Sequence, residues 1–176
     1  VLTGCDIPVS NFESLFYGER LQSCDHLEIP GAVRWQFASE VESVLAAINA
    51  HCRSARLKSL EIGRVNKVGL KAFAEAECLS NLQRFHIHEA SITVEDAQAL
   101  RNSSMMQHVR ELSLEGVSIP LDAMRTLCRT EYPSVVSLVL SNQYGPQTDI
   151  LEKALIHLIW SGAFPNLRFL SIDSLR

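Results

Sequence analysis

The sequence has no excess of basic residues and no long apolar run. Its 16 Lys and Arg residues are outnumbered by 20 Asp and Glu residues, dispersed along the chain for a net charge of −4. Proteins hold nucleic acids chiefly through contacts of Lys and Arg with phosphates, so this balance argues against a nucleic-acid partner. The longest apolar stretch lies around Leu155 to Trp160 and is far shorter than the ~20 residues of a membrane helix, so we expect no membrane-spanning segment.

The cysteines form no recognisable framework. There are five, at irregular spacing and without a CxxC pair: Cys5, Cys24, Cys52, Cys78 and Cys128. An odd, unpaired set indicates reduced thiols, which predicts an intracellular protein, cytoplasmic or nuclear. All but Cys5 fall on apolar stripes, where we expect them to be buried as small hydrophobic side chains.

Motifs of nucleotide binding and of hydrolysis are also absent. The sequence contains neither GxxxxGK[ST] nor GxGxxG, and it has no nucleophile elbow and no glycine-rich oxyanion loop. We therefore predict a protein that is not an enzyme, with no catalytic residues, no cofactor and no metal ligands.

One apolar pattern recurs along almost the whole chain. In the segment 109–119 apolar residues stand at the first, fourth, sixth and ninth positions, and related segments begin at residues 24, 57, 82, 135 and 167. Apolar and polar residues alternate within each copy, which predicts strands with one buried and one solvated face. The copies lie 25 to 33 residues apart, 28.6 on average, and strand-plus-helix units of ~20–29 residues stack as a solenoid. A doubly wound sheet would instead have continuous apolar strands.

Helix signals lie between these copies. Thr93 is expected to be an N-cap, with acidic residues following it in the first turn. The helix that it begins is expected to bury Val94, Ala97 and Leu100. The last helix is expected to stop at Ser161 and Gly162. Its predicted buried face consists of Ile150, Leu151, Ala154, Leu155, Leu158 and Ile159.

These residues resemble the leucine-rich-repeat family, in the longer-repeat branch typified by ribonuclease inhibitor. The family's LxxLxL core is present in the segments 57–62 and 109–114, and the segment 69–74 resembles its Gly-Leu-x-x-Leu-Ala helix start. The resemblance implies an α/β solenoid: a curved arc with a parallel sheet on the concave face and helices on the convex face. It also implies a single domain over residues 1–176, with about six to seven repeats.

The chain departs from the family at one position. Three residues after the last strand apolar, the family usually has Asn or Cys, whereas the residues here are Cys5, Ala32, Val65, Ala90, Val117 and Gln143. Without an Asn side chain, the backbone groups of these turns are expected to bond to other main-chain groups or to water.

Side chains at the third, fifth and seventh positions of each copy are expected to project from the concave face, which such folds commonly use to bind partners. Carboxylates outnumber cations among them, which favours a protein partner with a Lys- or Arg-bearing segment. The predicted contact residues are His26, Glu28, Ser59, Glu61, Arg84, His86, His88, Glu111, Ser113, Glu115, Val139, Phe169, Ser171 and Asp173.

Two histidines on this face invite a second interpretation. His86 and His88 are two residues apart and so face the same way, with Glu61 and Glu111 expected on the adjacent strands. A zinc site normally needs four convergent ligands, and no cysteine joins these residues. A solvent-exposed pair of histidines is therefore the favoured interpretation.

The sequence leaves three functions open. The leading hypothesis is a non-enzymatic protein-interaction module within a larger scaffold, sensor or ubiquitin-ligase substrate receptor, because the chain begins and ends inside a repeat. The second is a purely structural spacer or cap that contacts further domains or repeats of the same parent chain. The third is a small-molecule enzyme with a doubly wound sheet, in which Gly4, Cys5 and Asp6 would line a site.

Overall fold

The computed structural model describes residues 25–29, 45, 57–63, 70–142 and 148–174. Several sequence predictions fall outside this range: those for Cys5, Cys24 and Cys52, for the helix start in 69–74 at Gly69, and for the turn positions 32, 65 and 143.

The described part of the chain contains one six-stranded sheet whose strands are all parallel and follow the order of the sequence. Each strand begins two residues after the start of a predicted copy. The strands are β1 (His26–Ile29), β2 (Ser59–Gly63), β3 (Arg84–His88), β4 (Glu111–Glu115), β5 (Ser137–Asn142) and β6 (Phe169–Ser174). The predicted α/β class with a parallel sheet is confirmed. A doubly wound sheet is wrong for these strands, because their order never reverses.

The offset of two residues has a physical cause. In the copies that begin at residues 57, 82, 109 and 135, the first and fourth positions are both buried, as at Leu57 and Leu60, but an odd spacing cannot place both on one face of a strand. The backbone bends between them, and one carbonyl of the preceding unit accepts two successive N–H groups. The Lys58 carbonyl, for example, accepts from Gln83 at 2.8 Å and from Arg84 at 2.9 Å.

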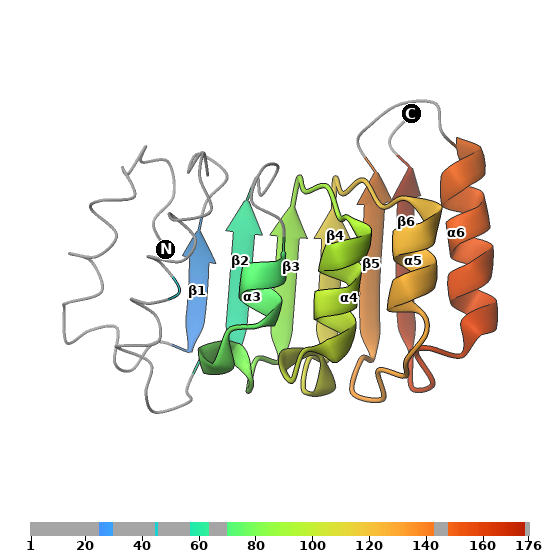
Figure 1. Cartoon of the computed structure of the whole chain (residues 1–176). Helices are drawn as coiled ribbons and strands as arrows, with labels where there is room; N and C mark the ends of the chain where they lie inside the picture. The colour runs from blue at the N-terminus through green and yellow to red at the C-terminus, as the bar shows by residue number, and fades with distance from the viewer. Residues whose placement is uncertain (1–24, 30–44, 46–56, 64–69, 143–147, 175–176) are drawn as a thin grey trace.

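Helices follow the strands and lie on one side of the sheet in Figure 1. They are α3 (Lys71–Ala74), α4 (Val94–Asn102), α5 (Leu121–Leu127) and α6 (Thr148–Ser161), with 3₁₀ turns η2 (Glu77–Leu79) and η3 (Met105–Gln107). Neighbouring helices pack in sequence order, α3 against α4, α4 against α5 and α5 against α6. Of the helices in the described part, none combines the length and apolar character that crossing a bilayer requires.

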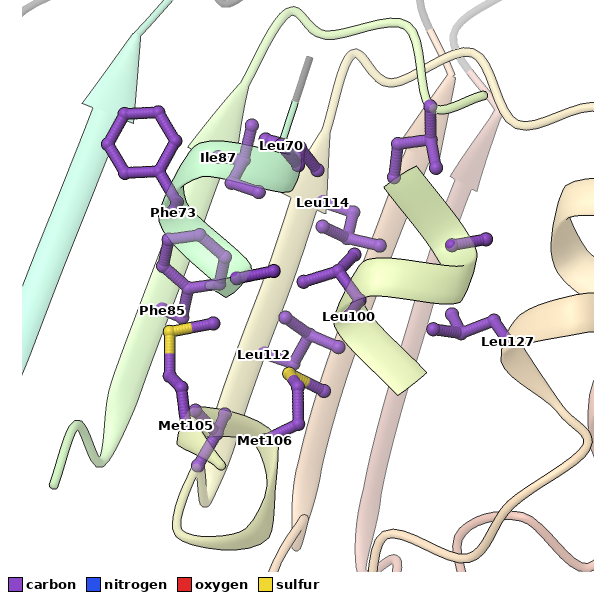
Figure 2. Packing of buried hydrophobic residues seen from close by; sticks show 14 of the residues in the cluster. Leu70, Phe73, Phe85, Ile87, Leu100, Met105, Met106, Leu112, Leu114 and Leu127 are labelled. Atoms are coloured by element: carbon purple, nitrogen blue, oxygen red, sulfur yellow. The ribbon is translucent and has the colours of Figure 1, made fainter. Parts of the chain in front are cut away.

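The core lies between the sheet and these helices. Figure 2 shows Phe85 and Ile87 from β3 and Leu112 and Leu114 from β4 among side chains of the helical layer. Those four are at most 3% exposed. In β3 the buried residues alternate with more exposed ones, as predicted. The apolar positions of β6 are more open, since Leu170 is half-buried and Ile172 is 40% exposed.

The N-terminus of α4 is capped as predicted, and the cap reaches a second helix. The Thr93 hydroxyl accepts from the Asp96 N–H at 3.1 Å, and the Thr93 N–H donates to Asp96 Oδ2 at 3.0 Å. The other oxygen, Oδ1, accepts from the N–H groups of Leu70 at 2.6 Å and Lys71 at 3.1 Å, at the start of α3. Asp96 is 3% exposed, so one buried carboxylate joins two consecutive units.

Two predicted core residues are exposed. Val94 is 45% exposed, because the buried face of α4 is centred on Asp96, Ala97 and Leu100. Ile159 is 60% exposed, whereas Leu158 is buried as predicted. The last unit also exposes four other large apolar side chains, Ile156 and Trp160 of α6 and Phe169 and Ile172 of β6.

The turn after β4 bonds through the main chain to the turn after β3 and to the end of β5, as expected without an Asn side chain. The Ser118 N–H donates to the Ala90 carbonyl at 2.9 Å, and the Val117 N–H donates to the Ser141 carbonyl at 3.0 Å. Ala90 and Val117 themselves are 2% and 4% exposed. Apolar side chains thus occupy these two turn positions, and backbone groups of adjacent units satisfy each other.

Candidate functional site

The helices lie on one side of the sheet in Figure 1. The predicted contact residues alternate with the strand residues that are buried on that side, so their side chains lie on the opposite face. We refer to it as the open face. The strand register aligns these side chains in rows that run across the sheet. The first row is His26, Ser59, Arg84, Glu111, Ser137 and Phe169; the second is Glu28, Glu61, His86, Ser113, Val139 and Ser171. A third contains Gly63, His88 and Glu115 and, further along, the pair Ser141 and Asp173.

Side chains from β2, β3 and β4 form a small cluster on this face. It consists of Glu61, His88, Ser113 and Glu115, and we call it the His88 cluster. His88 Nε2 lies 3.0 Å from Glu61 Oε1, and His88 Nδ1 lies 3.4 Å from Glu115 Oε2. The Ser113 hydroxyl donates to Glu115 Oε1 at 2.9 Å. Carboxylates only accept hydrogen bonds, so the ring donates to both glutamates at once only when both of its nitrogens carry a proton.

Glu61 and Glu111 lie on β2 and β4, the strands on either side of the histidine pair, as the sequence predicted. Glu61 is paired with His86 in the register but bonds to His88, and Glu111 lies opposite Arg84. The carboxylate beside His88 on β4 is Glu115. Over the described ranges, no group of three or more His, Cys, Asp and Glu side chains is arranged to hold a metal ion.

The cluster also lacks the contact that would activate a serine nucleophile. The Ser113 hydroxyl donates to a glutamate, and the two nitrogens of His88 face Glu61 and Glu115. Ser113 is only 2% exposed. A nucleophilic serine needs a base such as histidine within hydrogen-bond reach and access to substrate, and this arrangement offers neither.

Exposure divides the predicted contact residues into two groups. Ser59 and Ser113 are 4% and 2% exposed, because their short side chains lie between longer neighbours in the same rows. The rest are exposed or half-buried, and Phe169 is 55% exposed. A partner that lies on this face would touch the longer side chains and pass over the two serines.

The charge on the open face is predominantly negative. Arg84 is the permanently charged cation in the rows of the described strands, whereas the carboxylates in those rows are Glu28, Glu61, Glu111, Glu115 and Asp173. Glu111 and Asp173 are exposed to solvent, and Glu28, Glu61 and Glu115 are partly exposed. Their spread across the sheet makes this face attractive to cations.

Neither cysteine in the described part forms a disulfide. Cys128 is 7% exposed, as predicted, whereas Cys78 is only partly buried. Burial raises the pKa of the Cys128 thiol above its usual value, against the opposing effect of a hydrogen bond with Ser161. A buried thiol that remains protonated is a poor nucleophile and a poor ligand, which supports its assignment to the core.

Sequence reasoning missed a second surface, at the edge of the sheet where the strands begin. A groove there is lined by residues just before β4, β5 and β6, including Arg110 and Arg168. No motif marks these positions, since the equivalent residues in other units are Lys58, Gln83 and Val136. Comparisons of the chain with protein-family models, with curated proteins and with solved structures found no match.

Proposed function

We propose that this chain is a leucine-rich-repeat solenoid, a single curved domain that is not an enzyme and that binds a protein partner on its open, concave face. The partner contributes a segment with Lys or Arg side chains. The His88 cluster is the observation that carries the proposal, because it places Glu61 and Glu115 on either side of one ring. The parent protein is then a scaffold, a sensor or a ubiquitin-ligase substrate receptor.

The chemistry of the cluster suits a cationic side chain. Glu61 and Glu115 are 32% and 45% exposed, so their carboxylates remain accessible from solvent. A neutral His88 ring can donate to only one of them, and the other then remains available to accept from an ammonium or a guanidinium group. Charge-assisted hydrogen bonds of this kind are stronger than neutral ones.

The backbone beneath the cluster supports binding without reorganisation. Glu61, His88 and Glu115 belong to three neighbouring strands whose register is continuous from β2 to β4. The opposite faces of these strands are buried in the core. A preformed surface loses little conformational entropy on binding, so the contacts it makes are retained as affinity.

A structural spacer is the second candidate, and one observation favours it. The last unit exposes the large apolar side chains Ile156, Ile159 and Trp160, and Trp160 is 84% exposed. Apolar side chains that gather on a surface commonly mark a contact with another protein element. In this alternative the last unit packs against a further repeat or domain, and the open face binds nothing.

A peptide selection distinguishes the two candidates. The immobilised chain is offered a displayed peptide library whose members span acidic, neutral and basic compositions. The interaction function predicts enrichment of Lys- and Arg-containing peptides, with affinity that falls as salt concentration rises. Absence of any enriched peptide would favour the spacer, and enrichment of acidic peptides would reject the proposed partner.

The matched control compares two charge changes of equal size. The double variant Glu61→Gln with Glu115→Gln removes two carboxylates from the open face. The double variant Glu75→Gln with Asp122→Asn removes two exposed carboxylates from the helical side. Only the first should weaken the selected peptides, by roughly 10-fold or more. Equal weakening by both would mean that net charge, not this face, governs binding.

A further inference from the structure

A groove lies at the edge of the sheet where β4, β5 and β6 begin, at the lower end of these strands in Figure 1. It has a volume of about 480 Å³, within the range of roughly 300–1,000 Å³ that is common for small-ligand sites. Its lining consists of His108, Arg110, Pro133, Ser134, Val136, Asn166 and Arg168.

The two arginines occupy equivalent places in the repeat. Arg110 and Arg168 each precede a strand by one residue, and Val136 holds the same place in the unit between them. The Val136 N–H donates to the Arg110 carbonyl at 2.8 Å, and the Arg168 N–H donates to the Val136 carbonyl at 2.9 Å. Two strand spacings separate their backbones, about 10 Å, so their long side chains can approach one group from both sides.

The groove is positive in a chain with a net charge of −4. None of the residues that line it, all within the described ranges, is acidic. Arg110, Arg168 and His108 are exposed, and none of the ion pairs of the described residues includes either arginine. Their guanidinium donors are therefore available to a ligand.

Hydrogen bonds hold the loops around the groove in place. The Ser134 hydroxyl donates to the Gln107 carbonyl, and the Asn166 side-chain amide donates to the Pro133 carbonyl at 2.9 Å. His108 Nδ1 lies 3.3 Å from the Ser104 carbonyl oxygen. A carbonyl only accepts, so Nδ1 carries the hydrogen in this contact and Nε2 is left for another partner.

We propose that this groove binds a phosphate group carried by a phosphorylated serine or threonine of a partner protein. Two guanidinium groups and an imidazole match the charge of a phosphate dianion and its several acceptor oxygens. The volume suits one modified side chain with its neighbours and is too small for an extended nucleic-acid strand. The site is separate from the open face, so either can be correct without the other.

Calorimetric titration of the full chain tests this proposal with four ligands: a short phosphoserine peptide, the same peptide unphosphorylated, the same peptide with Glu at that position, and inorganic phosphate. We expect the phosphopeptide to bind at least roughly 10-fold more tightly than each of the others. Equal binding of the phosphorylated and unphosphorylated peptides, or no binding of either, would overturn the proposal. Inorganic phosphate that binds as tightly as the phosphopeptide would reject the peptide source.

Variants assign the binding to this groove. Arg110→Gln and Arg168→Gln should each weaken the phosphopeptide by roughly 10-fold or more, and Arg110→Lys should fall between wild type and Arg110→Gln, because it keeps the charge but loses the planar fork. Arg125→Gln removes the same charge from the exposed face of α5 and should leave affinity unchanged. Equal weakening by Arg125→Gln would contradict the assignment. Thermal unfolding of each variant confirms that it is folded.

Discussion

His88 Nε2 lies 3.0 Å from Glu61 Oε1, although the register pairs His88 with Gly63 and Glu61 with His86. The contact is therefore diagonal between β2 and β3. It is possible because Gly63 has no side chain to occupy the place beside the ring. The other ring nitrogen faces Glu115, so one side chain of β3 joins carboxylates of both neighbouring strands.

A double-mutant cycle measures this diagonal contact. His88→Ala, Glu61→Gln and the combined variant should give a coupling free energy of about 0.2–1 kcal/mol, because both side chains are about one-third exposed and solvent screens the pair. The free energy of unfolding is measured in urea, at low salt and at 1 M salt. The coupling should shrink at high salt. Strictly additive single variants would contradict the contact.

Asp96 is predicted to be among the most sensitive polar positions. Asp96→Ala removes the acceptor for Leu70, Lys71 and Thr93 N–H groups at once, so the free energy of unfolding should fall by about 3 kcal/mol or more. Asp96→Asn keeps one acceptor oxygen and should cost less. The control Asp122→Asn, at an exposed carboxylate of α5, should change stability by less than about 0.5 kcal/mol. A loss below about 1 kcal/mol for Asp96→Ala would show that the shared cap contributes little.

The C-terminal end of α6, at Ser161, depends on the backbone conformation of the next residue, Gly162. Its φ of +68° lies in the left-handed region, and a Cβ built there would meet no atom within 4 Å. Gly162→Ala should therefore cost about 1 kcal/mol through backbone strain alone, and Gly162→Asn should cost less because Asn tolerates this region better. Chemical denaturation gives both values. An alanine variant as stable as wild type would contradict the assigned conformation.

Alkaline pH should destabilise the fold through two buried groups. Burial raises the pKa of Cys128, and burial together with the nearby Cys128 raises the pKa of Tyr132, whose hydroxyl donates to the Leu127 carbonyl at 2.9 Å. Both groups remain neutral in the folded chain at pH values where the unfolded chain already ionises. Their contribution to stability is thus full below the ordinary pKa values and is lost as pH rises through the raised ones.

Urea denaturation at pH 7 and at several pH values above roughly 8.5 tests the predicted direction of this pH dependence. The free energy of unfolding of the wild type should decline with rising pH. The variant Cys128→Ala should start from a lower value and decline less steeply, because it removes one of the two groups. Stability that is constant or rises over the same range would contradict the burial of these groups.

Much of the fold could be predicted from the sequence because the repeats constrain each other. Alternation located the strands, and the spacing of the copies predicted their sequential order. Thr93 was identified as an N-cap because the hydrogen bond of its side chain is to a residue only three positions away in the sequence. Exposure of Val94 and Ile159 was missed, since helical periodicity does not show which side chains the neighbouring units cover.

The candidate sites were only partly predictable. The sequence placed His88, Glu61 and Glu115 on one face, but it did not show that the His88 ring lies between the two glutamates. The contact between His88 and Glu61 runs diagonally between two strands, beside Gly63. Only the strand register shows this arrangement. Arg110 and Arg168 were missed because they lie in the backbone bend just before a strand, where the alternation of the strand does not yet apply.

Chemical-shift mapping tests the central claim, that the open face is the surface on which a basic segment binds. A Lys- and Arg-containing peptide is titrated into isotopically labelled chain, and backbone amide shifts are followed. We predict that the largest changes cluster in β2, β3 and β4 around Glu61, His88 and Glu115. Changes confined to α4, α5 and α6, or no saturable change with any basic peptide, would contradict the claim.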